Sequence, residues 1–345
     1  MNINLLRYFF RQDRKDKVCG GFDISDHSIE YVVIGKDKGD ICIKFKDRLL
    51  LPEEIVENGN IKDIPGLVKM LRGISSGQRE VPSAIVMGLS ERVVYMHCFS
   101  VPKTEVKNLK NTVEEEARKI FPVNYQDLIL DYVSHELEGS YEIILAGAEK
   151  MVLQKYQELI RQLGYRSAIF EPEALALVRS VVQGDRAATS ALIVDFGFRY
   201  TGLYITDEGN IRLVSGLGRG GEEITAAIAD KFKISRKDAE TRKIKLGFKD
   251  SELLLILQFI PQLIIQEIIK MANFYKKTYG KNIERILLVG GGSLIPGMPE
   301  YFSRNVEKPV LFLSQDESIL YSAAIGLALR CFDVAGGINL FRKED

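Results

Sequence analysis

Two aspartates, each near the end of an apolar strand and each followed by a turn and a second strand, constrain the fold most strongly. Asp23 belongs to the first segment and Asp195 to the second, 172 residues later in a chain of 345. Apolar residues alternate on both sides of each turn, as is typical of a β-hairpin. A repeat at half the chain length indicates a weak internal duplication. We therefore expect two related α/β halves.

The length of the chain agrees with two lobes, and its net charge argues against a nucleic-acid partner. A chain of 345 residues is longer than one hydrophobic core usually spans, and 46% of its residues are hydrophobic. Lys and Arg together number 47, as do Asp and Glu, so the formal net charge is zero. Such a chain has no long-range attraction to nucleic acid, and we expect no nucleic-acid partner.

Cysteine and histidine spacing and the longest apolar segment favour a cytosolic protein. No C-x-x-C pair or metal-ligand spacing occurs among Cys19, Cys42, Cys98, Cys331, His27, His97 and His135. We expect all four cysteines to be reduced, with no metal centre built from them. Polar residues and a proline interrupt the segment 253–271, which predicts a buried helix and not a membrane span.

Three turns at strand ends have the composition of phosphate-binding loops. They span residues 23–28, 195–201 and 290–297 and contain glycine or hydroxyl residues, and the first two also contain carboxylates. Small residues let backbone N–H groups approach phosphate oxygens, and carboxylates hold Mg²⁺ through water. One glycine-rich turn is more often only a turn, but the order and spacing of three predict a nucleotide cleft.

The common catalytic patterns do not occur in the sequence. There is no Walker pattern G-x-x-x-x-G-K-[ST] and no G-x-S-x-G elbow. Ser293 follows three glycines, but no histidine lies at a position that indicates a catalytic triad. We assign no catalytic residue and expect at most a weak ATPase.

Helical spacing appears in several segments between the strands. Residues 52–71 are predicted to be helical, and a second helix through residue 120 has Thr104 as its expected N-cap. Residues 1–17 form a basic amphipathic tail. This tail has two interpretations, a contact with a membrane surface or partner, and a frayed terminus or a helix packed on its own domain.

Several segments match motifs of a known superfamily. Gly21-Phe22-Asp23-Ile24 with Ser28-Ile29 is similar to its first phosphate segment, and Asp195-Phe196-Gly197 with Thr201 to its second. Residues 287–297 (Leu-Leu-Val-Gly-Gly-Gly-Ser-Leu-Ile-Pro-Gly) resemble the adenosine segment and are the most specific match. Residues 171–179 and 323–330 resemble its two connecting helices. Over about residues 18–333 the chain resembles the actin-like ATPases, and among them the PilM family of type IV pilus assembly, a relative of FtsA.

The resemblance implies an α/β, actin-like (ribonuclease H-like) fold of two lobes with an inserted α+β subdomain. The implied divisions are a basic tail (1–17), a first-lobe core (18–101, 169–188 and 320–333), the inserted subdomain (102–168), a second-lobe core (189–225 and 284–319), a helical subdomain (226–283) and a C-terminal tail (334–345).

ATP and Mg²⁺ are the ligands that the resemblance implies, with Asp23 and Asp195 near magnesium, through water. The implied nucleotide-binding residues are Asp23, Ser25, Ser28, Asp195, Gly197, Thr201, Gly220, Gly221, Glu240, Lys243, Gly290, Gly291, Gly292 and Ser293. For the charged run 238–245, a solvated helix face is an equal alternative, because charged runs usually are that.

The first phosphate loop departs from the family pattern. Where the family has a glycine, small hydroxyl residues and a later lysine, this chain has Ser25, Asp26, His27 and Glu30. The Asp26 carboxylate would repel the β- and γ-phosphates, because two like charges ~4 Å apart cost about 1–4 kcal/mol. We therefore expect weakened ATP binding and still weaker hydrolysis.

The implied function is a cytoplasmic nucleotide-binding scaffold, attached peripherally to the inner membrane in a type IV pilus or related secretion system. PilM-like proteins bind the cytoplasmic N-terminal segment of the membrane protein PilN, which carries an Ile-Asn-Leu-Leu element. A PilN-like partner and other pilus inner-membrane and motor components are therefore expected. Two alternatives stay open: an FtsA-like protein that polymerises at the membrane, and an active ATPase or kinase.

Both ends of this chain contain a similar element. Ile3-Asn4-Leu5-Leu6 lies near the start and Ile338-Asn339-Leu340-Phe341 near the end. One hypothesis is that these tails occupy the same groove, in cis or in a neighbouring copy, and so cause self-association or autoinhibition. Matches of three or four residues arise easily, so the sequence alone supports this hypothesis weakly.

Overall fold

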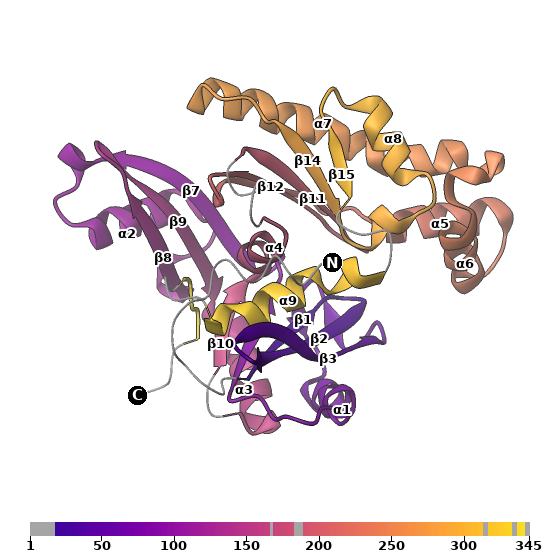
Figure 1. Ribbon diagram of the computed structural model, residues 1–345, viewed down its shortest axis with the longest axis horizontal. Coiled ribbons are helices and arrows are strands. Elements are labelled where there is room, and N and C mark those ends of the chain that lie inside the picture. The colour runs from indigo at the N-terminus through magenta and orange to yellow at the C-terminus, as the bar shows by residue number, and fades with distance from the viewer. Residues whose placement is uncertain (1–17, 166–167, 183–188, 313–316, 333–336, 342–345) are drawn as a thin grey trace. The chain divides into compact units, whose positions relative to one another are not determined.

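The computed structural model describes residues 18–165, 168–182, 189–312, 317–332 and 337–341 (Figure 1). These residues form two compact units. The second unit is Val181–Ser322, and the first unit consists of the described residues before and after it. From the sequence we expect the chain to change lobe near residues 188 and 320.

The first unit is built on a five-stranded sheet in the order β10-β6-β1-β2-β3. Its strands are β1 (Cys19–Ile24), β2 (Ser28–Asp37), β3 (Asp40–Leu50), β6 (Ala84–Leu89) and β10 (Ala168–Pro172). The strands β1, β6 and β10 run parallel, whereas β2 is antiparallel to both of its neighbours. The carboxyl ends of the parallel strands therefore meet at one edge, where the turn after Asp23 lies.

The sheet of the second unit has the order β13-β12-β11-β14-β15. Its strands are β11 (Ala191–Phe196), β12 (Thr201–Asp207), β13 (Asn210–Leu217), β14 (Arg285–Val289) and β15 (Val310–Phe312). Parallel and antiparallel pairs follow one another as in the first sheet. Asp23 and Asp195 are each the fifth residue of the matching strands β1 and β11. The two sheets thus agree with the predicted internal duplication.

Helices pack on both sheets. In the first unit they are α1 (Ile64–Ser75), α3 (Lys150–Leu163), α4 (Glu173–Val181) and α9 (Ser322–Leu329). In the second unit they are α5 (Gly221–Phe232), α7 (Leu254–Tyr279) and α8 (Met298–Asn305), and α6 (Arg236–Leu246) packs on α5. Helix α9 crosses β1 closely, since a Cβ on Gly21 would lie 2.4 Å from the Ala324 carbonyl oxygen.

A three-stranded sheet of the first unit forms the inserted part, in the order β7-β9-β8. It consists of β7 (Val94–Pro102), β8 (Leu128–Glu136) and β9 (Ser140–Glu149), and α2 (Leu109–Ile120) packs on it through Val113 and Ala117 (Figure 1). The expected boundary at residue 102 therefore falls at the end of its first strand. Thr104 is not the N-cap of α2, because the Asn108 side chain accepts the Asn111 N–H.

Residues 52–71 are only partly helical, which corrects the sequence prediction. A short hairpin of β4 (Val56–Glu57) and β5 (Asn60–Ile61) comes first, and α1 begins at Ile64. The turn residues Asn58 and Gly59 have φ of 50° and 72°. Asn-Gly favours such a left-handed turn, and this local preference outweighs the helical spacing.

Helix α7 buries one face and exposes the other, so the predicted buried helix is correct for one face. Leu257, Ile260 and Ile264 are at most 1% exposed in the core of the second unit. Leu255, Phe259, Ile269 and Phe274 are exposed on α7. By length and composition alone Ser251–Tyr279 could cross a membrane, with 39% of its most apolar window buried.

The prediction that all cysteines are reduced is wrong for one pair. Cys19 in β1 and Cys331, which follows α9, form a disulfide with Cα atoms 6.2 Å apart. The two residues are 312 positions apart in the sequence, so no local spacing could reveal the pair. The packing of α9 across β1 brings them together.

Candidate functional site

Asp195 and the glycine turn after β14 are in direct contact in the second unit. Strands β11 and β14 are parallel neighbours, and Asp195 lies opposite Val289. The chain then turns at Gly290, whose φ is 80°, and a Cβ there would lie 2.4 Å from Asp195 Oδ1. Ser293 closes the turn, because its hydroxyl donates to the Gly290 carbonyl at 2.6 Å. Glycine at position 290 therefore lets this backbone reach the carboxylate.

The turn after Asp195 also holds the start of α5. The Gly221 N–H donates to the Gly197 carbonyl at 3.1 Å, and the Glu222 N–H donates to the Phe198 carbonyl at 2.8 Å. The Thr201 hydroxyl donates to the Arg219 carbonyl at 2.9 Å. A Cβ on Gly220 would lie 2.4 Å from the Phe198 carbonyl oxygen. The first two helix N–H groups, which lack partners inside a helix, thus bond to the turn.

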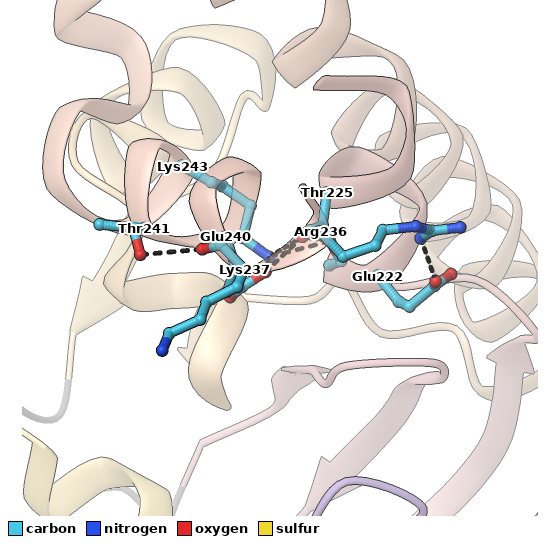
Figure 2. Close-up of polar contacts among 8 residues, drawn as sticks. Glu222, Thr225, Arg236, Lys237, Glu240, Thr241 and Lys243 are labelled. Atoms are coloured by element: carbon cyan, nitrogen blue, oxygen red, sulfur yellow. Dashed lines mark hydrogen bonds and ion pairs between the residues drawn. The ribbon is translucent and has the colours of Figure 1, made fainter. Parts of the chain in front are cut away.

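Lys243 links α6 to this helix start (Figure 2). Its ammonium donates to the Gly221 carbonyl at 2.9 Å and to the Thr225 hydroxyl at 2.8 Å, and lies 2.7 Å from Glu240 Oε2. Lys243 is 3% exposed, so burial lowers the pKa of its ammonium, and the Glu240 carboxylate opposes this. The alternative of a solvated helix face is therefore wrong for Lys243.

Thr225 is a member of this cluster that sequence reasoning missed. It lies one helical turn after Gly221, and its hydroxyl bonds to the Gly221 carbonyl at 3.0 Å and to the Glu240 carboxylate. The i, i+4 spacing from Gly221 was a usable signal, because residues four apart share a helix face.

Arginines balance the acidic first turn of α5. Glu222 pairs with Arg236, and Glu223 pairs with Arg219 (Figure 2 draws the first pair). Carboxylates at a helix start would repel a phosphate, and these pairs offset that charge.

The first phosphate loop lies in the first unit and is closed by Ser25. Its hydroxyl accepts the N–H groups of His27 at 3.2 Å and Ser28 at 3.0 Å, and donates to the Ser28 carbonyl at 3.1 Å. Such a serine turn fixes the loop after Asp23 without any ligand. Ser25 and Ser28 are therefore together, and their polar groups are engaged with each other.

Asp26 and Glu30, which distinguish this loop from the family pattern, each have a structural role. Asp26 accepts the N–H groups of Asn58 and Gly59 at 2.9 and 2.8 Å, so it anchors the β4–β5 turn. Glu30 lies on β2 and binds Arg48 Nε on β3 at 2.6 Å. Burial raises the pKa of the Glu30 carboxyl, and Arg48 opposes this shift. The Asp26 carboxylate, which we expected to repel phosphate, thus links the loop after β1 to the β4–β5 turn.

Three carboxylates gather near the buried Tyr156 of α3. Its hydroxyl donates to the Gly59 carbonyl at 2.9 Å. Burial raises the pKa of the Tyr156 phenol, and Glu173, Asp26 and Asp23 raise it further. Sequence reasoning did not select Glu173, which begins α4 directly after β10. The signal that could have indicated Glu173 is its position directly after β10, at the carboxyl edge of the same sheet as Asp23.

The structure gathers the predicted second-unit residues into one network. Asp195 touches the Gly290 turn, Gly197 binds Gly221, and Lys243 joins Gly221 to Glu240. Asp23, Ser25 and Ser28 form the corresponding turn of the first unit. Within the described residues no three His, Cys, Asp or Glu side chains converge as a metal site. Mg²⁺ is commonly held by one or two carboxylates plus phosphates, so single aspartates in such turns fit that ion.

Solved structures of the same architecture define the class. The chain is similar to the structure described as a PilM-PilN type IV pilus biogenesis complex, with a TM-score of 0.80, 19% identity and coverage of 91% of this chain and 98% of that one. It is also similar to EutJ of Carboxydothermus hydrogenoformans, with a TM-score of 0.57, 16% identity and 94% coverage of each chain. The chain is similar as well to MreB5 of Spiroplasma citri bound to AMPPNP, with a TM-score of 0.55, 14% identity and coverage of 89% of this chain and 94% of that one. The fold is that of the actin-like ATPases, as the sequence predicted.

The family model described as type IV pilus assembly protein PilM matches residues 21–332. This chain therefore belongs to the PilM family, which confirms the resemblance drawn from its motifs.

Proposed function

We propose that this chain is a cytoplasmic scaffold of a type IV pilus inner-membrane complex and that it binds Mg-ATP. The observation that carries nucleotide binding is the contact of the Asp195 carboxylate with the Gly290 turn. A carboxylate next to a turn of small residues is suited to a hydrated Mg²⁺ and a phosphate or sugar approaching the backbone.

Each group in the network would have a distinct part in binding. Asp23 and Asp195 would hold Mg²⁺ through water, and Gly290–Gly292 would face the adenosine. Lys243 can donate three hydrogen bonds, and Gly221, Thr225 and Glu240 engage its ammonium. It would therefore act by holding α5 in place, while Glu240 faces the ribose side.

The nucleotide would serve as a structural or switching ligand, and turnover would be weak at most. A ligand shifts a conformational equilibrium only through different affinities for the two states.

The proposed partner is a PilN-like inner-membrane protein, bound through its cytoplasmic N-terminal segment. Membership of the PilM family and likeness to the PilM-PilN complex support this partner. Attachment through such a protein would place this chain peripherally at the inner membrane.

Co-purification tests the partner. The full chain should be recovered with a detergent-solubilised PilN-like protein and lost when that protein's cytoplasmic N-terminal segment is deleted. Recovery that is the same with and without the segment would contradict the proposed docking, as would no recovery with the intact protein. Sedimentation of this chain alone with Mg-ATP tests the FtsA-like alternative. A polymerising FtsA-like protein would sediment without any partner.

A further inference from the structure

Helix α7 has an apolar side that the described residues leave uncovered. Its other side packs on β12, β13, α5 and α8 of the second unit (Figure 1). On the uncovered side Leu255 is 82% exposed, and Phe259, Ile269 and Phe274 are each more than half exposed. We call this side, which carries these four residues, the α7 face. Apolar side chains gathered on one exposed surface are typical of an interaction site.

Two glutamines lie in the middle of the α7 face. Gln262 and Gln266 are exposed and stand between Phe259 and Ile269 along the helix. A primary amide both donates and accepts hydrogen bonds, so one glutamine can satisfy another. In a lipid surface these amides would lose hydrogen bonds without replacement, which is costly. The α7 face is therefore better suited to a second copy of itself than to a membrane.

The charges along the α7 face are distributed unequally. Glu252, which also binds Arg242 at 2.7 Å, is exposed just before the helix begins. Lys270, Lys276 and Lys277 are exposed in the second half of the helix. A parallel partner would place lysines beside lysines, whereas an antiparallel partner places them beside the acidic end. The charge pattern thus favours an antiparallel pair.

An antiparallel pair centred on residues 252–277 brings complementary side chains to the same level. Phe259 lies level with Lys270 of the second copy, which permits a cation–π contact. Glu252 lies level with Lys277 of the second copy, which permits an ion pair. Phe259 and Lys270 are about three helical turns apart in one chain, and Glu252 and Lys277 about seven, so each pair shares one side of the helix. A two-fold axis makes each contact occur twice.

We propose that two copies of this chain associate through their α7 faces as a closed, antiparallel dimer. Leu255 then lies level with Phe274 of the second copy, and Gln262 lies within one residue of the level of Gln266. The paired amides fix the register, as a single polar residue does between coiled helices. The contact is symmetric, so it gives a dimer and not a filament. The dimer needs neither nucleotide nor the PilN-like protein, so it goes beyond the proposed function.

Sedimentation equilibrium of the full chain, without nucleotide or partner, tests the dimer. We expect a dissociation constant on the order of 10 µM, because one helix face is a small interface. Phe259→Lys should weaken dimerisation at least about tenfold, because it places like charges level with each other at two positions. Its side chain is exposed, so the fold should persist, which circular dichroism checks. Met151→Lys, at an exposed apolar position of α3, is the matched control and should dimerise normally.

A charge-rescue variant tests the orientation of the two helices. Phe259→Lys combined with Lys270→Glu should restore the dissociation constant to within about threefold of that of the unmodified chain. In a parallel pair residue 259 would lie level with its own copy, so the second substitution would not compensate. Failure of the rescue would therefore contradict the antiparallel arrangement.

Three further results would overturn the dimer. One is a monomer at every concentration up to about 200 µM, well above the expected dissociation constant. Another is equal dimerisation of Phe259→Lys and the unmodified chain. The third is flotation of a monomeric chain with vesicles of phosphatidylethanolamine and phosphatidylglycerol, lost in Phe259→Lys, which would assign the α7 face to a membrane surface.

Discussion

Glu171→Ala is expected to lower the free energy of unfolding by about 3–5 kcal/mol, because it leaves two largely buried arginines without their carboxylate. Glu171 is fully buried at the end of β10. Its oxygens accept two hydrogen bonds from Arg179 at 2.7 and 2.8 Å, and Arg330 Nε lies 3.2 Å away. Arg330 is 8% exposed. Guanidinium unfolding followed by circular dichroism measures the change.

Glu158→Ala is the matched control for this prediction. Glu158 also accepts two hydrogen bonds from one arginine, Arg161, at 2.7 and 2.6 Å, but at the surface. Exposed ion pairs contribute little because water and salt screen them. Its unfolding midpoint should match that of the unmodified chain. Equal midpoints for the two variants would show that burial of Glu171 does not determine its contribution.

Gly326→Ala should destabilise the first unit by about 3 kcal/mol, at the upper end of what overpacking usually costs. Helix α9 passes α4 so closely that a Cβ on Gly326 would lie 1.8 Å from the Ala176 carbonyl oxygen. Backbone cannot rotate away as a flexible side chain can, so the helices must separate. Arg179 also donates to the Gly326 carbonyl at 2.9 Å, and that bond would be strained. Differential scanning calorimetry measures the loss.

Gly73→Ala separates the effect of packing from that of helix propensity. Gly73 lies in α1, and apart from its chain neighbours and the backbone of its own helix no described atom lies within 4 Å of its added Cβ. Alanine in an open helical position should stabilise the chain by up to about 1 kcal/mol. If both glycine variants shift stability in the same direction, close packing of α9 on α4 is not the reason for Gly326.

The predicted strands and turns came from local patterns, and these were correct where one pattern dominates. The hairpins that follow Asp23 and Asp195 combine period-2 apolar runs with clear turn residues. Residues 52–71 contain two competing signals, and the Asn58-Gly59 turn prevails over helical spacing. We predicted that the residues of β7 belong to the first-lobe core, because the sequence indicates a strand there but not which sheet the strand joins.

Long-range features of the site could not be read from the sequence. Lys243 lies in a charged run that looks solvated, and only the approach of α6 to Gly221 buries it. Cys19 and Cys331 are joined through the packing of α9 on β1. The segment 338–341 was predicted as part of a tail, whereas in the structure it is hydrogen-bonded to the open edge of β10. In each case the cause is a neighbour far away in the sequence.

Calorimetric titration of Mg-ATP into the full chain, Asp195→Ala and Asp230→Ala tests the central claim most directly. Asp230 is exposed at the far end of α5 and serves as the charge-matched control. We predict saturable binding to the unmodified chain and to Asp230→Ala, and at least tenfold weaker binding to Asp195→Ala, or about 1.4 kcal/mol. Absence of binding heat in the unmodified chain, or equal affinity in all three proteins, would contradict a nucleotide site at Asp195.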